Sequence, residues 1–386
     1  MPTTPYWKLS GFYFFYFASI GAFVPYWGLY LRDQGFNPAQ IGELMAIIMA
    51  TKIIAPNVWG WLADTTGQRT WVIRVAALLA LVCFSGVTLY SGYWWMAAMM
   101  ALFSFFWNAA LPQFEALTMN RLGSRTNRYA RIRLWGSIGF IASVALLGPL
   151  FERVEVSVLP WIVLVLLAAM WLTTLVVSDG PPGVQARSTS SLLATLRRPE
   201  VLALILACFL MQASHGPYYA FFTIYLEDNG YSRTMAGQLW ALGVLAEVGV
   251  FLMMHRWLPR FGAWPLLMVA IGVTAVRWWL LASLPQLLPV MLLTQVMHAA
   301  SYGLYHAAAI SLIHEFFPGR LQGRGQALYS SLSFGLGGAL GSLASGHVWD
   351  GIGPHWVYIM ASGLAALGLI VAWFGAKQGR LTAQQW

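Results

Sequence analysis

Residues 30–36 read Tyr-Leu-Arg-Asp-Gln-Gly-Phe, and residues 225–231, 195 positions later, read Tyr-Leu-Glu-Asp-Asn-Gly-Tyr. The match continues without a gap, because Gly-Glu-Leu-Met-Ala at 42–46 aligns with Gly-Gln-Leu-Trp-Ala at 237–241. The offset is close to half of the 386 residues. The sequence therefore predicts two related halves that follow one another in the same orientation.

Each copy of this stretch has the composition of a turn between two helices. Gly35 and Gly230 allow a tight turn, and Asn37 before Pro38 in one copy and Ser232 in the other are typical helix starts. The repeated unit is therefore the end of one helix, a short loop and the beginning of the next.

The composition indicates that these helices lie in lipid. Hydrophobic residues make up 59% of the chain and charged residues only 9%, which is too little charge for the surface of a soluble protein. Apolar stretches of roughly 20 residues, the length that spans a bilayer, recur between short polar breaks. We expect an all-α integral membrane protein with twelve crossings, near 7–30, 39–62, 71–90, 94–118, 133–150, 158–177, 199–226, 235–256, 264–283, 287–312, 326–345 and 355–375.

The basic residues predict the orientation in the membrane. Of the 22, three lie on one side of this topology, Arg32, Arg153 and Arg233, and two lie inside helices, Lys52 and Arg277. The other seventeen lie on the opposite side: Lys8, Arg69, Arg74, Arg121, Arg125, Arg128, Arg131, Arg133, Arg187, Arg197, Arg198, Arg256, Arg260, Arg320, Arg324, Lys377 and Arg380. From the positive-inside rule we expect both termini on the cytoplasmic side of a bacterial inner membrane.

The polar stretch between the halves predicts the domain boundaries. Residues 178–183 read Ser-Asp-Gly-Pro-Pro-Gly, and the segment stays polar through Ser191, a composition that buries too little apolar surface to fold. We expect a six-helix bundle over 1–177, a cytoplasmic linker over 178–198 and a second six-helix bundle over 199–386.

The loop at residues 60–69 reads Gly-Trp-Leu-Ala-Asp-Thr-Thr-Gly-Gln-Arg. Its pattern resembles the G-x-x-x-D-x-x-G-x-R motif of the major facilitator superfamily, which implies a fold of two six-helix bundles around a central substrate site. The resemblance assigns Gly60, Asp64, Gly67 and Arg69 to a conformational motif. Gly60 lets helices approach, Gly67 permits the turn, and Asp64 is an acceptor at a helix end.

Within the superfamily the chain looks like the lactose permease family. Pro-Gln-Phe-Glu-Ala at 112–116 and Arg-Ile-Arg-Leu-Trp-Gly at 131–136 resemble the segments that supply the sugar-binding carboxylate and arginine of that family, which assigns these roles to Glu115 and Arg133. The alternative for this pair is a purely structural contact between helices.

The same resemblance extends to the second half of the chain. This resemblance implies that Arg277 and His298 are coupling residues and that Glu247 is the carboxylate of the eighth predicted crossing. We also expect Glu247 to be the partner of Arg277. Ser301 stands where the lactose permease family has a proton-accepting Glu. The Arg277 and Glu247 pair is equally consistent with a gate and with a static brace.

The chain is more similar to the 3-phenylpropionate transporter group, which has a basic residue near Lys52 and a second helix-ten histidine, here His306. Ionisable groups inside a membrane span are expensive unless they face water, a ligand or an opposite charge, so Lys52 is a candidate binding residue. A structural ion pair is its alternative. His298 and His306 fit a proton relay, or else they are packing histidines.

The predicted core contains three cations, Lys52, Arg133 and Arg277, but only two carboxylates, Glu115 and Glu247. The leading hypothesis is therefore proton-coupled import of a small organic anion, most simply an aromatic carboxylate such as 3-phenylpropionate. The alternatives are a sugar or glycoside:proton symporter and, because of Ser301, an uncoupled exchanger.

Other classes of function find little support in the sequence. His314-Glu315 begins a zinc-protease pattern, but Pro318 occupies the position of the second histidine, and the chain has neither a G-x-S-x-G elbow nor a P-loop. We expect that the protein is not an enzyme and that it binds no metal and no cofactor. The expected partners are a small-molecule substrate, protons and the lipid bilayer, with no nucleic acid, and the expected state is a monomer.

Overall fold

The computed structural model describes residues 6–123, 128–178 and 192–383 of the chain. Within these ranges all regular secondary structure is helical, which confirms the predicted all-α fold class. The helices of the first half are α1 (Tyr6–Asp33), α2 (Pro38–Thr66), α3 (Arg69–Ser85), α4 (Tyr93–Leu122), α5 (Tyr129–Phe151) and α6 (Leu159–Leu175), with one-turn 3₁₀ segments at 86–88 and 156–158.

The second half follows a short helix, α7 (Leu192–Leu196). Its longer elements are α8 (Pro199–Ser214), α9 (Gly216–Asp228), α10 (Arg233–Phe261), α11 (Ala263–Ser283), α12 (Leu288–His298), α13 (Tyr305–Phe316), α14 (Gln322–Tyr329), α15 (Gly338–Ile352) and α16 (Pro354–Ala383). Two π-helical segments, η4 (Ala299–Leu304) and η6 (Ser330–Gly337), join α12 to α13 and α14 to α15, and a 3₁₀ turn, η5 (Gly319–Leu321), precedes α14.

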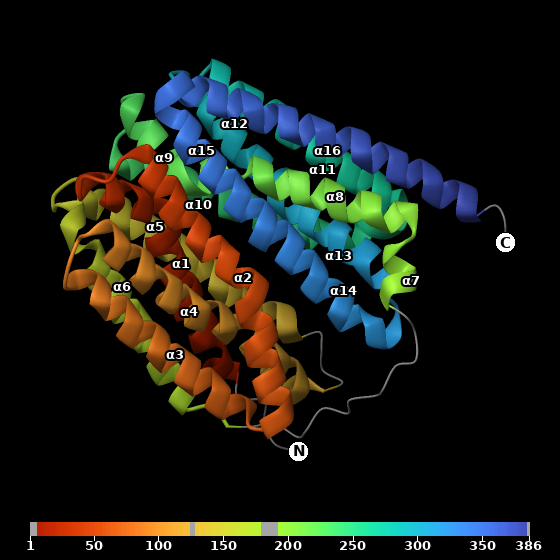
Figure 1. Ribbon diagram of the computed structural model, residues 1–386, viewed down its shortest axis with the longest axis horizontal. Coiled ribbons are helices and arrows are strands. Elements are labelled where there is room, and N and C mark those ends of the chain that lie inside the picture. The colour runs from red at the N-terminus through yellow and green to blue at the C-terminus, as the bar shows by residue number, and fades with distance from the viewer. Residues whose placement is uncertain (1–5, 124–127, 179–191, 384–386) are drawn as a thin grey trace. The chain divides into compact units, whose positions relative to one another are not determined.

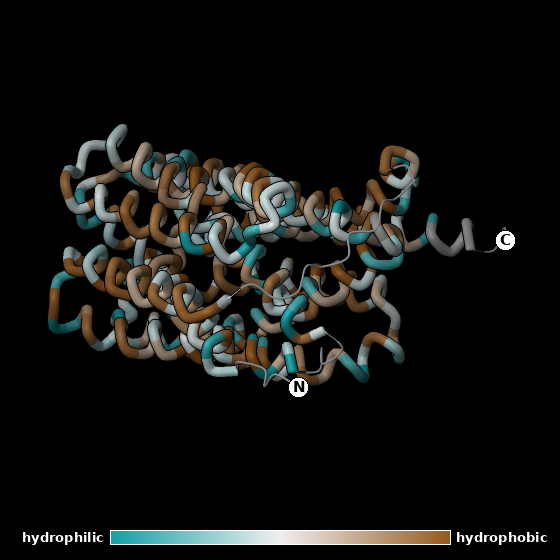
Figure 2. The backbone as a smooth tube through the Cα atoms, turned by 90° about the horizontal axis from the view of Figure 1, so that it is seen from below, coloured by the Kyte–Doolittle hydropathy of each residue, from teal (hydrophilic) through white to brown (hydrophobic). Residues whose placement is uncertain are grey.

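These elements match the twelve predicted crossings. In the described part of the chain, ten helical stretches are individually long and apolar enough to cross a membrane, with α8 and α9 forming one of them. The remaining two predicted crossings, 287–312 and 326–345, coincide with the stretches that contain η4 and η6. Figure 2 shows hydrophobic residues along the helices and hydrophilic ones at many of the helix ends, as a bilayer requires.

Local sequence explains where the repeated helices begin and end. The side chain of Asn37 accepts a hydrogen bond from the backbone N–H of Gln40, and the side chain of Gln40 accepts one from the N–H of Asn37, so α2 begins with a capping box. The glycines of the repeated turn, Gly35 and Gly230, have φ angles of 85° and 82°, a region that favours glycine. The two copies of the repeat thus form the same turn.

The chain divides into two compact units. One comprises residues 1–185 together with 220–241, and the other comprises residues 186–219 together with 242–386. The end of α9 and the beginning of α10 therefore pack with the helices of the first half. Most of the predicted linker, residues 179–191, lies outside the described residues, and α7 lies within its last part.

In the second unit, α16 runs beside α8 and α11 (Figure 1). Glycines permit the close approach of α8 to η6 and α15: a Cβ atom on Gly337 would lie 2.7 Å from the carbonyl oxygen of Phe209. Backbone atoms of Gly216 and Gly341 also meet closely. Small residues at such contacts are typical of membrane helices, where packing rather than the hydrophobic effect holds helices together.

Candidate functional site

Lys52 lies in the middle of α2 and is partly buried. In the described part of the chain, the polar contact of its ammonium group is the thioether of Met49, with 3.5 Å between Nζ and Sδ. A thioether is a weak acceptor and carries no charge. The structure thus places this cation inside a membrane helix, with no ion pair among the described residues.

A polar network that the sequence analysis missed lies beside Lys52. The hydroxyl of Thr51 donates to Ser104 Oγ at 2.9 Å, and the amide of Asn108 donates to Thr51 Oγ1 at 2.9 Å and to the Ile48 carbonyl at 3.1 Å. These bonds join α2 to α4 one residue away from Lys52. Single uncharged polar residues give a weak sequence signal, and only the packing of the two helices brings them together.

Glu115 of α4 and Arg133 of α5 form an ion pair, with 3.6 Å between Glu115 Oε1 and Arg133 Nε. Tyr129 donates its hydroxyl to the same carboxylate oxygen at 3.2 Å, and the Arg133 guanidinium lies 3.9 Å from the centre of the Phe17 ring. Both charged side chains are about one third exposed. The pair predicted from the sequence exists, but its role as a substrate contact stays a prediction.

The loop motif forms a charged contact at the end of α2. Arg69 donates to Asp64 Oδ1 at 2.7 Å and to Gln113 Oε1 of α4 at 2.8 Å. Gly67 ends α2 with a φ angle of 67°. A Cβ atom on Gly60 would lie 3.4 Å from the Gln113 side chain, which is an ordinary van der Waals contact. Arg69 and Asp64 thus tie the α2–α3 turn to α4.

Arg277 of α11 is completely buried in the second unit. It donates to the Thr294 carbonyl at 2.8 Å, to Ser301 Oγ at 2.9 Å and to His298 Nδ1 at 3.2 Å. Its guanidinium also lies 4.4 Å from the ring centres of both Tyr218 and Trp278. The Nη2 atom of Arg277 is buried and has no hydrogen-bond partner among the described residues.

His298 lies between Arg277 and Glu247. Its Nδ1 faces Arg277 and its Nε2 lies 3.9 Å from Glu247 Oε2. Because a guanidinium only donates hydrogen bonds, His298 Nδ1 must accept, and the ring proton of the neutral histidine is on Nε2, toward Glu247. The sequence analysis expected Arg277 and Glu247 to face each other, and the structure inserts this imidazole in the chain of contacts.

His306 continues the same row of side chains. Its ring stacks on Tyr302 with 6.1 Å between centroids, and Tyr302 stacks on His298 with 5.7 Å. His306 Nδ1 lies 3.3 Å from the hydroxyl of Tyr329. The π-helical segment η4 lies between the two histidines and keeps these three rings on one side. Tyr302 and Tyr329 were missed because an isolated tyrosine in a membrane helix is usually a packing residue.

The structure therefore groups the predicted residues in separate clusters. Arg277, His298 and Glu247 form one cluster in the second unit, followed by His306. Glu115 and Arg133 form another in the first unit, where Lys52 lies beside its own α2–α4 network.

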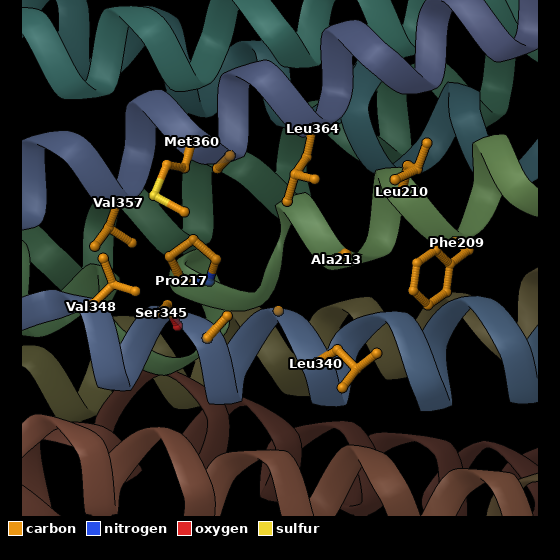
Figure 3. Close-up of a pocket in the computed structure, with 13 residues that line it drawn as sticks. Phe209, Leu210, Ala213, Pro217, Leu340, Ser345, Val348, Val357, Met360 and Leu364 are labelled. Carbon is orange, nitrogen blue, oxygen red and sulfur yellow. The ribbon is translucent and has the colours of Figure 1, made fainter.

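An apolar pocket of about 240 Å³ lies in the second unit, between α8, α9, α15 and α16 (Figure 3). Phe209, Leu340, Val357 and Met360 line it, and Ser345 is the polar side chain among its lining residues. None of the charged residues predicted for binding lines this pocket.

An all-helical membrane fold with charged side chains inside it is typical of a membrane transporter. The model of the MFS_1 like family matches residues 6–360, and the chain belongs to this family. It is a multi-pass membrane transporter of the major facilitator type.

Two curated relatives cover nearly the whole chain. The "Probable 3-phenylpropionic acid transporter" of Escherichia coli (strain K12) is 29% identical over 371 residues, which is 92% of this chain and 94% of the relative. The "Maltose permease" of Geobacillus stearothermophilus is 29% identical over 382 residues, which is 97% of this chain and 95% of the relative.

Solved structures share the fold. The crystal structure of the nucleoside transporter NupG has a TM-score of 0.80 at 17% identity and covers 97% of this chain and 98% of its own. The structure of the POT family transporter PepTSo has a TM-score of 0.82 at 11% identity and covers 98% of this chain and 99% of its own.

Proposed function

We propose that the protein is a proton-coupled importer of a small aromatic carboxylate in the bacterial inner membrane, with both termini in the cytoplasm. The observation that carries this proposal is the environment of Lys52. Placing a lysine at the centre of a membrane helix costs about 2.5–3.5 kcal/mol on insertion scales. In the described chain the polar contact of its ammonium is a thioether, so a bound carboxylate supplies the missing negative charge.

Charge counting among the candidate residues supports an anionic substrate. Arg133 has Glu115 as its ion-pair partner, and Arg277 reaches Glu247 through His298. Lys52 remains as the third cation, and the unpartnered Nη2 of Arg277 is a second donor for an anionic group. The 29% identity to a relative named for 3-phenylpropionic acid is consistent with an aromatic acid.

The chain of contacts from Arg277 to Glu247 supplies a route for coupling. Protonation of His298 would put an N–H group against the Arg277 donor, so Glu247 is the better proton acceptor. Protonation removes the negative charge of Glu247 and weakens its attraction for the Nε2–H of His298, and the imidazole can then change its contact with Arg277. His306 and Tyr329 extend this row and provide a relay for the proton.

The proposal is tested with purified protein in proteoliposomes. We expect uptake of labelled 3-phenylpropionate under an inward proton gradient. Lys52→Met should weaken binding about ten- to hundredfold, the worth of one hydrogen bond to a charged group. Lys52→Arg should keep more affinity, and Lys8→Met, at an exposed lysine of α1, should behave as the parent. Normal transport by Lys52→Met would refute the proposal.

A second candidate is a sugar or glycoside:proton symporter. The cluster of Glu115, Arg133, Tyr129 and Phe17 combines a carboxylate, a guanidinium and an aromatic face, which suits a sugar. The identity to a maltose permease points the same way. A thermal-shift panel of aromatic acids against disaccharides separates the two, because only the true substrate class should raise the melting temperature.

The contact between Arg277 and Ser301 favours a third candidate, an uncoupled exchanger, because a serine does not titrate where a carboxylate would. Alkalinisation of a weakly buffered medium on substrate addition would exclude it.

A further inference from the structure

The apolar pocket of the second unit lies at the break between α8 and α9. Figure 3 shows Met360 of α16 and Leu340 of α15 on opposite sides of the pocket, with Ala213 and Pro217 between them. Both Ala213 and Pro217 line the pocket. Pro217 has no backbone N–H, so it cannot continue the helical hydrogen bonds of α8. The break therefore forms the floor of the pocket, and α15 and α16 form its walls.

The lining of the pocket is unsuited to water. Among the described residues that line it, Ser345 carries the one polar side chain, and its hydroxyl already donates to the Ser342 carbonyl of the same helix at 2.8 Å. A buried water needs two to four polar partners, and an apolar cavity of roughly 150 Å³ in another protein stays dry and binds benzene. A pocket of about 240 Å³ with this lining therefore takes an apolar occupant.

The position of the pocket along its helices places it at membrane depth. Ala213 and Pro217 lie near the middle of the stretch Pro199–Asp228, which is long and apolar enough to cross a membrane. Val357, at the end of the pocket nearest the α15–α16 turn, is close to the start of a second such stretch, Pro354–Gln378. The pocket thus runs from the middle of the membrane toward this turn, within one leaflet.

One side of the pocket is open, and its length suits a hydrocarbon chain. Leu340 and Met360 line the pocket from α15 and α16, and they are 45% and 49% exposed. The lining spans residues 340–348 of α15, a length of about 12 Å at about 1.5 Å per residue. One leaflet of the hydrocarbon core is about 15 Å thick. The open side therefore faces acyl chains, and the pocket can hold most of one chain.

We propose that this pocket binds one acyl chain of a membrane phospholipid, with the end of the chain against the break between α8 and α9. A chain on an ordinary helix surface touches protein on one side, whereas a chain in the pocket makes dispersion contacts with α8, α9, α15 and α16. The bound chain fills the space beside Gly216 and Gly341, whose backbones are in close contact. An occupied pocket thus supports the α8–α9 break from the lipid side.

Photo-crosslinking tests the site. The protein is reconstituted in phosphatidylethanolamine vesicles in which a small fraction of the lipid carries a diazirine in the middle of one acyl chain. After irradiation, mass spectrometry identifies the labelled residues. Leu102 of α4 has the same exposed fraction as Leu340, 45%, and is the reference for ordinary lipid contact. Leu340 should be labelled about three- to tenfold more than Leu102, because a chain in the pocket is held in place.

Filling the pocket supplies the second arm of the test. Ala344→Phe places a ring in the pocket from α15 and should lower the labelling of Leu340 to the level of Leu102. Ala366→Phe, at an exposed alanine of α16 that does not line the pocket, is the matched control and should leave this labelling unchanged. Gel filtration and circular dichroism check folding, and Ala344→Leu, with a smaller side chain, replaces Ala344→Phe if that variant does not fold.

Two results would overturn the site. One is equal labelling of Leu340 and Leu102 in the parent, and the other is undiminished labelling of Leu340 in a folded variant at Ala344. The crosslinking needs no substrate and no proton gradient, so its outcome is independent of the proposed transport function.

Discussion

Two cations inside helices, the partly buried Lys52 and the fully buried Arg277, show how differently a membrane protein can accommodate a positive charge. Arg277 presents a rigid fork of donors, and three acceptors from α12 and η4 meet it, together with two aromatic faces. Lys52 carries a compact charge on a flexible stem, next to a thioether. Arg277 therefore has several acceptors within the protein, whereas the ammonium of Lys52 has no ion pair among the described residues.

Coupling can be tested at Glu247. Glu247→Gln imitates the protonated carboxyl group, so substrate exchange across the membrane should persist while accumulation driven by a proton gradient falls to the equilibrium level. The measurement compares counterflow with gradient-driven uptake of the same labelled acid. Glu315→Gln, at an exposed glutamate of α13, is the matched control. Intact accumulation by Glu247→Gln would remove this residue from the coupling route.

At the scale of the element, two crossings of the second half contain π-helical segments. In the first, η4 separates His298 from His306 and leaves both rings stacked on Tyr302. In the second, η6 ends at Gly337, where the backbone of α8 comes close. π segments occur often at functional sites, because they turn side chains that a regular helix would direct elsewhere. His215 lies at the break between α8 and α9 and precedes Gly216 and Pro217.

The surroundings of two glycines predict opposite effects on stability when each is replaced by alanine. Gly337→Ala should lower stability by about 1–3 kcal/mol, because the new methyl group overlaps the Phe209 carbonyl. Gly351→Ala, in α15 with no neighbour within 4 Å of the new methyl group, should raise stability by about 0.5–1 kcal/mol through helix propensity. Thermal unfolding in detergent measures both. A melting temperature of Gly337→Ala at or above that of the parent would contradict the close packing.

For the whole molecule, the distribution of basic residues predicts which side of the membrane each turn occupies. The first repeated turn, with the exposed Asp33, should face away from the cytoplasm, and the α2–α3 turn, with the exposed Thr65, should face it.

Labelling of single cysteines in intact cells tests this topology. Asp33→Cys should react with an impermeant maleimide added outside, and Thr65→Cys should react only after permeabilisation. Both variants are made in the background without Cys83 and Cys208. The reverse pattern would invert the orientation.

Sequence alone determined the solvent, the twelve crossings, the repeat and its turns, because these depend on local composition, on periodicity and on the backbone freedom of residues such as Gly35 and Gly230. It also marked the buried charges, since a charge in lipid is conspicuous in any sequence. Only the tertiary structure decided which of them meet. That His298 stands between Arg277 and Glu247 depends on how helices distant in sequence rotate and pack, which no local pattern encodes.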